Sequence, residues 1–302
     1  MTNDHQNQPH LPVLKAEVLA YLAPKPGESY LDLTAGYGGH AEAVLALTGS
    51  PEKSVLVDRD RESIAFLSAR FEKSRIIDSD FLSAAQALAA ENQKFDLILA
   101  DLGIASPHID IPQRGFSFTH SGPLDMRMDQ RQSDSAELYV NQLSEAELAE
   151  IIGSYGEEPR SRKIAAAIKA NRPIKNTAEL AAVISRAAGK NFRRSKIHPA
   201  TKTFQALRIA VNDELGQLQA GLPLMCELLA PGGRLAVISF HSLEDRLVKH
   251  YFSEVAGDQY DAIARLLTKK PVIASPNELD INPRARSAKL RAVAKIKTER
   301  TN

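Results

Sequence analysis

The chain has 302 residues, of which 43% are hydrophobic and 25% charged, and its formal net charge of +1 is typical of an ordinary globular protein. No apolar run reaches the roughly 18 residues of a membrane span, and the polar first nine residues lack the apolar core of a signal peptide. A single cysteine, Cys226, excludes an internal disulfide and a multi-cysteine zinc site, so we expect a cytoplasmic protein.

Helix and strand patterns alternate through the first hundred residues. The predicted elements are helix 14–22, strand 30–33, helix 41–47, strand 54–58, helix 62–71, strand 75–77, helix 82–91 and strand 95–101. Such alternation indicates an α/β fold, a parallel sheet with helices on both faces. Right-handed crossovers bring the carboxyl ends of its strands to one edge. We therefore expect Asp58, Asp101 and the glycine-rich turn after residue 33 to meet there.

The pattern changes after Asp101. Residues 109–140 are rich in loop signals, Ser144 and Glu147 form a capping box, and helical patterns continue to about residue 190. A glycine-weakened helix is predicted over 203–229, and a strand over 234–240 after the Pro-Gly-Gly at 231–233. Residues 289–297 alternate and predict a last, antiparallel edge strand. Its inward residues are Leu290, Ala292, Ala294 and Ile296, and its outward residues are Arg291, Lys295 and Lys297.

Charge is distributed unevenly along the chain. Residues 1–158 contain 12 basic and 25 acidic residues, whereas residues 159–202 contain 12 basic residues and one acid, Glu179. This basic run is either a surface that contacts phosphates or a solvated helical face. We expect a core interrupted by an insert, with core parts at 1–108 and 206–302 and a helical, basic, RNA-recognising insert at 109–205.

Residues 32–40, DLTAGYGGH, follow a strand and open a helix. Glycines in such a turn let the backbone approach a ligand, and Asp58, 20 residues past Gly38, stands where an acid accepts hydrogen bonds from a ribose. Together they indicate a nucleoside-bearing cofactor. The turn also fits the G-x-G-x-x-[GA] motif of dinucleotide enzymes at Gly36, Gly38 and Ala41, and a turn without any ligand is the simpler alternative.

Two further clusters carry polar groups. Asp101 ends the most apolar strand, so it either lies beside the cofactor or caps a turn. Residues 239–246, SFHSLEDR, invite a serine-hydrolase interpretation, which we reject because neighbours on one strand do not converge as a triad. Ser239 or Ser242 instead begins the next helix, and the histidines show no metal spacing, so no metal is expected.

The chain resembles the bacterial RsmH (MraW) family of 16S rRNA cytosine-N4 methyltransferases. The matching motifs, in the family's order, are residues 10–14 (HLPVL), 38–40 (GGH), 58–60 (DRD), 101–107 (DLGIASP), 114–118 (RGFSF), 122–128 (GPLDMRM), 155–158 (YGEE), 198–208 (HPATKTFQALR), 239–246 (SFHSLEDR) and 282–287 (NPRARS).

The resemblance implies a class I (Rossmann-like) methyltransferase core with an inserted helical domain, S-adenosyl-L-methionine as cofactor, and methylation of N4 of a decoding-region cytidine. It implies cofactor contacts at Gly38, Gly39, His40, Asp58, Phe81 and Asp101, and at His108, where the family usually has Gln. The implied partner is 16S rRNA, within the small ribosomal subunit, with no membrane. Whether the protein forms a homodimer is left open.

Methyl transfer to cytosine N4 requires an in-line arrangement, because the cofactor already supplies a strong electrophile. We expect Asp101 to accept the N4 hydrogens, and Cys226, outside every motif, argues against attack by a cysteine at carbon 5. The basic residues expected to bind RNA phosphates are Arg160, Arg162, Lys163, Arg193, Arg194 and Lys196. Two alternatives stay open: a nucleotide-dependent oxidoreductase, and an RNA-binding protein without activity.

Overall fold

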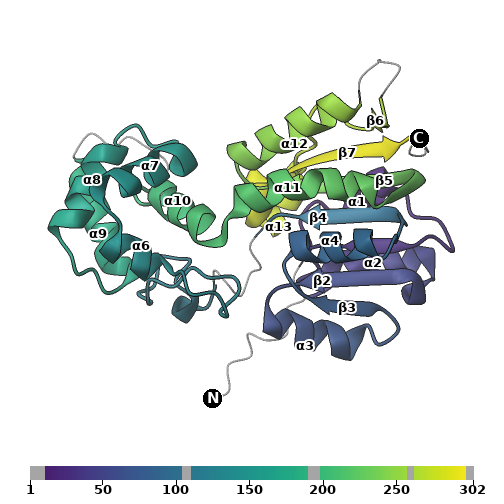
Figure 1. The fold of residues 1–302 in the computed structure, drawn as a ribbon, viewed down its shortest axis with the longest axis horizontal. Coiled ribbons are helices and arrows are strands. Elements are labelled where there is room, and N and C mark those ends of the chain that lie inside the picture. The colour runs from purple at the N-terminus through teal and green to yellow at the C-terminus, as the bar shows by residue number, and fades with distance from the viewer. Residues whose placement is uncertain (1–10, 104–109, 190–197, 257–261, 297–302) are drawn as a thin grey trace. The chain divides into compact units, whose positions relative to one another are not determined.

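The computed structural model describes residues 11–103, 110–189, 198–256 and 262–296. The chain divides into two compact units, residues 1–103 with 216–302, and residues 104–215 (Figure 1). We call them the sheet unit and the helical unit. In sequence, the helical unit stands between the two parts of the sheet unit. None of the helices in the described residues is long and apolar enough to cross a membrane.

The described strands of the sheet unit form one seven-stranded sheet in the order β3-β2-β1-β4-β5-β7-β6. The strands are β1 (Tyr30–Asp32), β2 (Ser54–Asp58), β3 (Arg75–Asp78), β4 (Phe95–Asp101), β5 (Leu229–Ser239), β6 (Ala264–Leu266) and β7 (Lys289–Lys295). The first five strands pair in parallel, and β7 pairs antiparallel with β5 and β6. The predicted doubly wound, Rossmann-like fold is confirmed.

Helices cover both faces of the sheet because its central strands are apolar on both sides. Val57, Ile98 and Val237 point to one face, whereas their strand neighbours Leu56, Leu99 and Ala236 point to the other. The first face is covered by α4 (Phe81–Ala90), α11 (Glu214–Glu227) and α12 (Ser242–Val255). The second is covered by α1 (Lys15–Leu22), α2 (Gly39–Thr48), α3 (Arg61–Arg70) and α13 (Pro276–Ile281).

The helical unit has a separate apolar core, to which Ile152, Ile168 and Phe204 belong. Its helices are α6 (Ala136–Gln142), α7 (Glu145–Gly156), α8 (Ser161–Ala170), α9 (Thr177–Ala188) and α10 (Thr201–Asn212). The predicted capping box is confirmed, because the Ser144 hydroxyl accepts from the Glu147 amide and the Glu147 carboxylate accepts from the Ser144 amide. This reciprocal bonding fixes where α7 begins.

The prediction of a single helix over residues 203–229 is wrong. The segment consists of two helices, α10 and α11, separated by Asp213, whose φ of 46° is left-handed. The boundary predicted after residue 205 falls inside α10, which belongs to the helical unit. The strand predicted from residue 234 begins earlier, at Leu229, because Gly232 and its neighbours form an irregularity within β5.

The prediction for the last strand is partly wrong. It is antiparallel, but β6 pairs with its outer side, so β7 is not an edge strand. Arg291 and Lys295 are buried, and the Lys295 ammonium donates to the carbonyls of Cys226, Glu227 and Leu229. Ile296, predicted to face inward, is 51% exposed. Alternation alone cannot show that a buried cation has partners. Lys297 lies outside the described residues.

Candidate functional site

Four strands of the sheet unit, β1 to β4, end on aspartates at the same edge. β1 lies between β2 and β4, with Asp32 opposite Leu56 and Leu99, so Asp58 and Asp101 each stand two residues beyond it. The glycine-rich turn starts from the same edge and is tied to both neighbours, because the Leu33 amide donates to Leu99 and the Ala35 amide donates to Val57. The prediction that Asp58, Asp101 and the glycine-rich turn lie at one edge of the sheet is therefore confirmed.

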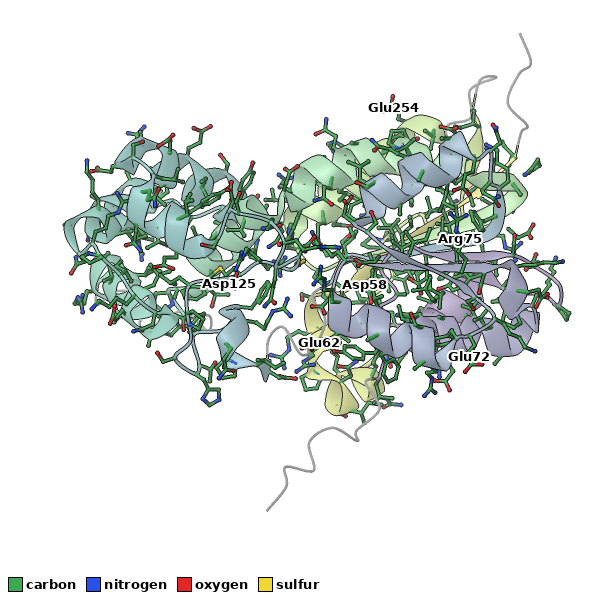
Figure 2. All side chains as sticks on the ribbon, turned by 60° about the horizontal axis from the view of Figure 1, so that its bottom comes forward. Asp58, Glu62, Glu72, Arg75, Asp125 and Glu254 are labelled. Carbon is green, nitrogen blue, oxygen red and sulfur yellow. The ribbon has the colours of Figure 1, made fainter. Side chains whose placement is uncertain are left out.

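Asp58, labelled in Figure 2, links the glycine turn to the turn that follows β2 through two hydrogen bonds. Its Oδ2 accepts from the Gly36 amide at 2.7 Å, and its Oδ1 accepts from the Asp60 amide at 2.8 Å. Burial raises the pKa of the Asp58 carboxyl, and these two amide donors oppose the rise. Each carboxylate oxygen keeps a further lone pair, so Asp58 can still accept hydrogen bonds from a ligand.

The surroundings require glycine at position 38 and leave little space for a side chain at Gly39. Gly38 has a φ of +76°, and a Cβ there would lie 2.3 Å from a ring carbon of Phe71. A Cβ on Gly39 would lie 3.3 Å from the Pro12 side chain. The first turn of α2 therefore begins with bare backbone, and amides at a helix N-terminus are suited to polar or anionic ligands.

Two hydrogen bonds hold Asp101 in place, one from its backbone amide to Thr34 and one from the following turn to its side chain. Its amide donates to the Thr34 hydroxyl at 2.6 Å, and its Oδ1 accepts from the Gly103 amide at 3.2 Å. A Cβ on Gly103 would lie 2.7 Å from the Phe240 ring, so this turn lies directly against an aromatic side chain. Among the described residues, Oδ2 of Asp101 accepts no hydrogen bond. That oxygen is available to a ligand.

His40 is the least satisfied polar side chain of this edge. It is 7% exposed, and neither ring nitrogen has a hydrogen-bond partner among the described residues. Its Nε2 lies 3.6 Å from Oδ2 of Asp101, beyond hydrogen-bonding distance. Buried polar atoms in folded proteins are normally paired, so two unpaired ring nitrogens beside an unpaired carboxylate oxygen indicate that a polar ligand completes this site.

Asp32 belongs to the glycine motif, but no role was predicted for it. It is buried, its Oδ2 accepts from the Tyr30 hydroxyl at 2.7 Å, and its Oδ1 accepts from the Thr34 amide at 3.2 Å. Burial is the main cause that raises the pKa of Asp32 to about 6, and Tyr30 and His40 oppose that rise. Its position as the last residue of the strand before the glycine turn was the available signal.

Phe81 begins α4, directly after Asp80, which caps that helix. Its ring lies in the core of the sheet unit, and a Cβ on Gly221 of α11 would lie 2.8 Å from it. The preceding segment reaches the Asp58 strand end, because the Ser79 amide donates to the Asp58 carbonyl. Phe81 therefore stands at the same edge as Asp58, with its ring turned into the core.

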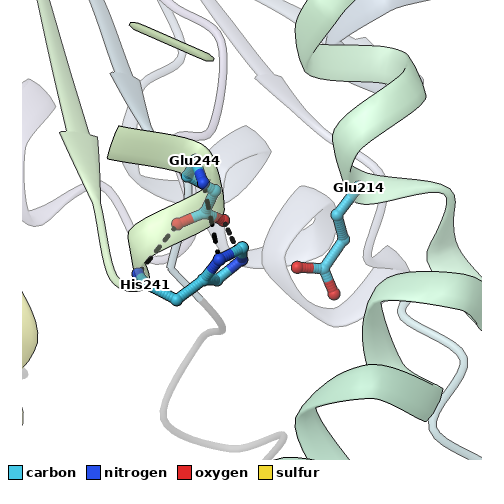
Figure 3. Close-up of side chains that lie close together, drawn as sticks. All are labelled: Glu214, His241 and Glu244. Atoms are coloured by element: carbon cyan, nitrogen blue, oxygen red, sulfur yellow. Dashed lines mark hydrogen bonds and ion pairs between the residues drawn. The ribbon is translucent and has the colours of Figure 1, made fainter. Parts of the chain in front are cut away.

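The prediction that Ser239 or Ser242 begins the next helix is confirmed for Ser242, the first residue of α12, and the residue that caps this helix is His241. The His241 ring accepts from the Glu244 amide, and the Glu244 carboxylate accepts from the backbone amides of His241 and Phe240 (Figure 3). Ser242 is the first residue of α12, and Ser239 is the buried last residue of β5. The hydroxyl of Ser239 has no hydrogen-bond partner among the described residues.

The predicted basic residues of the helical unit divide into two kinds. Arg160 supports the fold, because its side chain donates to the Ala188 carbonyl. Arg162 and Lys163 are exposed on α8 and, within the described part of the chain, make no hydrogen bond or ion pair. His108, Arg193, Arg194 and Lys196 lie outside the described residues.

Comparison with known proteins places this site in context. Residues 7–296 match the model of the MraW methylase family. The chain is 47% identical to "Ribosomal RNA small subunit methyltransferase H" of Nostoc sp., with 95% of this chain and 92% of that relative covered. It is 46% identical to the protein of the same name from Acidobacterium capsulatum, with 96% and 99% covered.

Two solved structures are similar at lower identity. An rRNA methylase from Streptococcus thermophilus matches with a TM-score of 0.43 and 9% identity, covering 96% of this chain and 100% of that one. A SAM-dependent O-methyltransferase from Thermotoga maritima matches with a TM-score of 0.43 and 10% identity, covering 99% and 70%.

Proposed function

Since this chain belongs to the MraW methylase family, we propose that it methylates the N4 amine of a decoding-region cytidine in the 16S rRNA of the small ribosomal subunit. The methyl donor is S-adenosyl-L-methionine. Relatives of nearly the same length carry the name of small-subunit rRNA methyltransferases, which supports the rRNA as substrate. The family membership favours a methyltransferase over an oxidoreductase that shares the glycine turn.

The pair of unpaired ring nitrogens on buried His40 is the observation that carries the assignment of the cofactor site. The residues present fit the donor: bare backbone at Gly38 and Gly39, an acid with free lone pairs at Asp58, and at Asp101 a carboxylate oxygen that accepts no hydrogen bond from a described residue. We propose that Asp58 accepts hydrogen bonds from the ribose hydroxyls of the cofactor, a common role for an acid at the end of a strand. Phe81 and His108 complete the proposed set from the family resemblance.

When bound, the cofactor supplies an electrophilic methyl group, so the protein needs no covalent nucleophile. We assign to Oδ2 of Asp101 the role of accepting a hydrogen bond from the N4 amine. That oxygen accepts no hydrogen bond from a described residue, whereas Oδ1 is occupied by the Gly103 amide. The Thr34 hydroxyl and the Gly103 amide hold the aspartate, so its position is fixed before the substrate arrives.

A base must leave its stack to reach such a site, at a cost of a few kcal/mol. We propose that the basic surface of the helical unit offsets this cost by binding phosphates. Arg162 and Lys163 are its described members, both exposed and without partners among the described residues, and Arg193, Arg194 and Lys196 are further candidates in the same basic run. Arg160 instead supports the helical unit through its bond to Ala188.

The proposal is tested by incubating the protein with labelled S-adenosylmethionine and small ribosomal subunits from a strain that lacks the gene. The product rRNA is digested to nucleosides and analysed by mass spectrometry. We expect N4-methylcytidine, and we expect Asp101→Asn to lower the rate of methyl transfer by more than it lowers the affinity for the cofactor. Label in C5-methylcytidine would contradict the proposed target atom. RNA binding without any transferred methyl would instead identify a binding protein without activity.

A further inference from the structure

A polar hollow lies in the sheet unit beside β7, two strands from β4, whose end belongs to the proposed cofactor site. It has a volume of ≈ 280 Å³, which includes space open to solvent, and it lies between α12, β6, β7 and the segment after β6. Its polar lining residues are Lys249, Ser253, Thr268, Lys269 and Arg291, and its apolar ones are Phe252 and Leu266. None of the described lining residues is acidic.

Arg291 forms the fixed part of this lining. It is 7% exposed, and its Nε donates to Oδ1 of Asp245 at 2.7 Å. Lys289 donates to the other oxygen of Asp245 at 3.1 Å. Asp245 is therefore shared by two cations and does not neutralise the hollow. Among the described residues, Nε is the one nitrogen of the Arg291 side chain that makes a hydrogen bond, so the other donors of its guanidinium remain for a ligand.

Thr268 adds a buried hydroxyl donor. It is 4% exposed, and its oxygen accepts from the Ala292 amide at 3.0 Å. Its hydroxyl hydrogen has no acceptor among the described residues, although a buried donor is normally paired. A polar group in the hollow would pair it, and this is the second observation, independent of charge, that indicates a ligand with acceptor atoms.

Two lysines and a serine form the rim. Lys249, Ser253 and Lys269 are exposed, and within the described part of the chain none of their side chains makes a hydrogen bond or an ion pair. Glu254, labelled in Figure 2, follows Ser253 on α12 and is exposed. It is not among the residues that line the hollow. The hollow thus offers hydrogen-bond donors from a guanidinium, two ammonium groups and two hydroxyls, which suits an anion with several oxygens.

We propose that this hollow is a binding site for a phosphate group, formed by Arg291, Thr268, Ser253, Lys249 and Lys269. The favoured source is a phosphodiester of the RNA substrate. Arg291 on β7 pairs with Val237 of β5, and Asp101 of β4 pairs with the next residue of β5, Ile238. β7 is two strands from β4, which corresponds to roughly 10 Å, so the site is close enough to the sheet edge to hold RNA that flanks the target base.

The first test uses inorganic phosphate and does not depend on the proposed function. Amide shifts of residues 249–253 and 268–269 are followed by NMR in the full-length protein during titration with phosphate at constant ionic strength. We expect saturable shifts, weakened about fivefold or more in the Lys249→Gln/Lys269→Gln variant. The control, Lys15→Gln/Lys73→Gln, removes two exposed lysines elsewhere in the sheet unit and should match the wild type. Equal phosphate affinity in both variants would overturn the proposal.

The second test identifies the source of the phosphate, and it rests on the proposed function. Binding of a single-stranded decoding-region RNA is measured at several salt concentrations. If the RNA backbone occupies the site, the pocket variant should bind more weakly than the control, and its log–log salt slope should fall by up to about 1.4, or ~0.7 for each lost contact. Weaker phosphate binding with unchanged RNA binding would overturn the RNA backbone as the source and assign the site to a free phosphate ligand.

Discussion

The amide of Gly36 donates a hydrogen bond of 2.7 Å to Oδ2 of Asp58, so the glycine turn after β1 is joined directly to the end of β2. The same carboxylate accepts from the Asp60 amide at the start of the next helix. Asp58 therefore shapes the turn and also offers acceptors at the proposed ribose position. A substitution at Asp58 should affect both roles, and the first prediction separates them.

We expect Asp58→Ala to weaken S-adenosylmethionine binding by about 1–3 kcal/mol, because hydrogen-bonding groups of both ligand and turn lose their partner. Isothermal titration calorimetry measures this directly. The control is Asp60→Ala, which removes the cap that accepts from the Glu62 amide and should cost ~1 kcal/mol of stability while it leaves cofactor affinity unchanged. An unchanged dissociation constant for Asp58→Ala would remove this residue from the ribose site.

The second prediction concerns Gly38. Its φ is +76°, and an added Cβ would meet the Phe71 ring, whereas Gly27 has a φ of +86° with nothing within 4 Å. Gly27→Ala therefore measures the backbone strain alone, on the order of 1–2 kcal/mol. In urea unfolding, we expect Gly38→Ala to lower the free energy of unfolding more than Gly27→Ala does. We also expect it to weaken binding of the cofactor. Replacing Phe71 with Ala should recover part of the excess cost of Gly38→Ala, and equal costs at both glycines would mean that the ring moves away freely.

The third prediction follows from Asp32, whose pKa burial raises from 3.8 to about 6. Because the folded pKa lies above the unfolded one, the folded state holds this proton more tightly. The stabilisation is complete below about pH 3.8 and is lost as the pH rises to about 6. A shift of this size corresponds to about 3 kcal/mol. Asp32→Asn cannot ionise, so relative to the wild type it should gain stability between about pH 4 and pH 7.

Urea unfolding of the wild type and of Asp32→Asn, at about pH 4 and about pH 7, measures this difference in the free energy of unfolding. The contributions of the other titrating groups cancel because both proteins contain them. A wild-type minus variant difference that stays constant with pH would show that Asp32 ionises as it does in the unfolded chain. Tyr30→Phe is a useful second variant, because the Tyr30 hydroxyl bond favours the charged carboxylate. Its loss should raise the pKa of Asp32 further.

The strand ends of the sheet unit were predictable because an alternating β and α pattern leaves few arrangements. The positions of Asp58 and Asp101 followed from that pattern alone. The unpaired nitrogens of His40 and the contact of Gly38 with Phe71 were not predictable, because each depends on packing between residues distant in sequence. Family resemblance named His40 and Gly38, but it could not give these reasons.

The orientation of the charged side chains in the last strand was predicted wrongly for a different reason. Arg291 was expected to face outward, yet it is buried because Asp245 on α12 supplies a partner. The prediction of one helix over residues 203–229 was wrong at Asp213, where the backbone is left-handed. Composition does not reveal such a residue when it is not a glycine. Hydrophobic periodicity identifies elements, whereas partners of buried charges and local reversals of the backbone depend on tertiary structure.

The last prediction concerns the basic surface of the helical unit. Arg162 and Lys163 are exposed and unpaired among the described residues, whereas the Arg172 side chain donates to the carbonyls of Val140 and Leu143. Arg162→Gln/Lys163→Gln should keep both stability and cofactor affinity, weaken RNA binding and lower its salt slope by roughly 0.7–0.9 per lost phosphate contact. Arg172→Gln should instead lower stability with little change in slope, because it loses buried hydrogen bonds rather than phosphate contacts. If the double variant keeps its RNA affinity at both low and high salt, these two cations serve only solubility, and the phosphate contacts must be sought elsewhere on the protein.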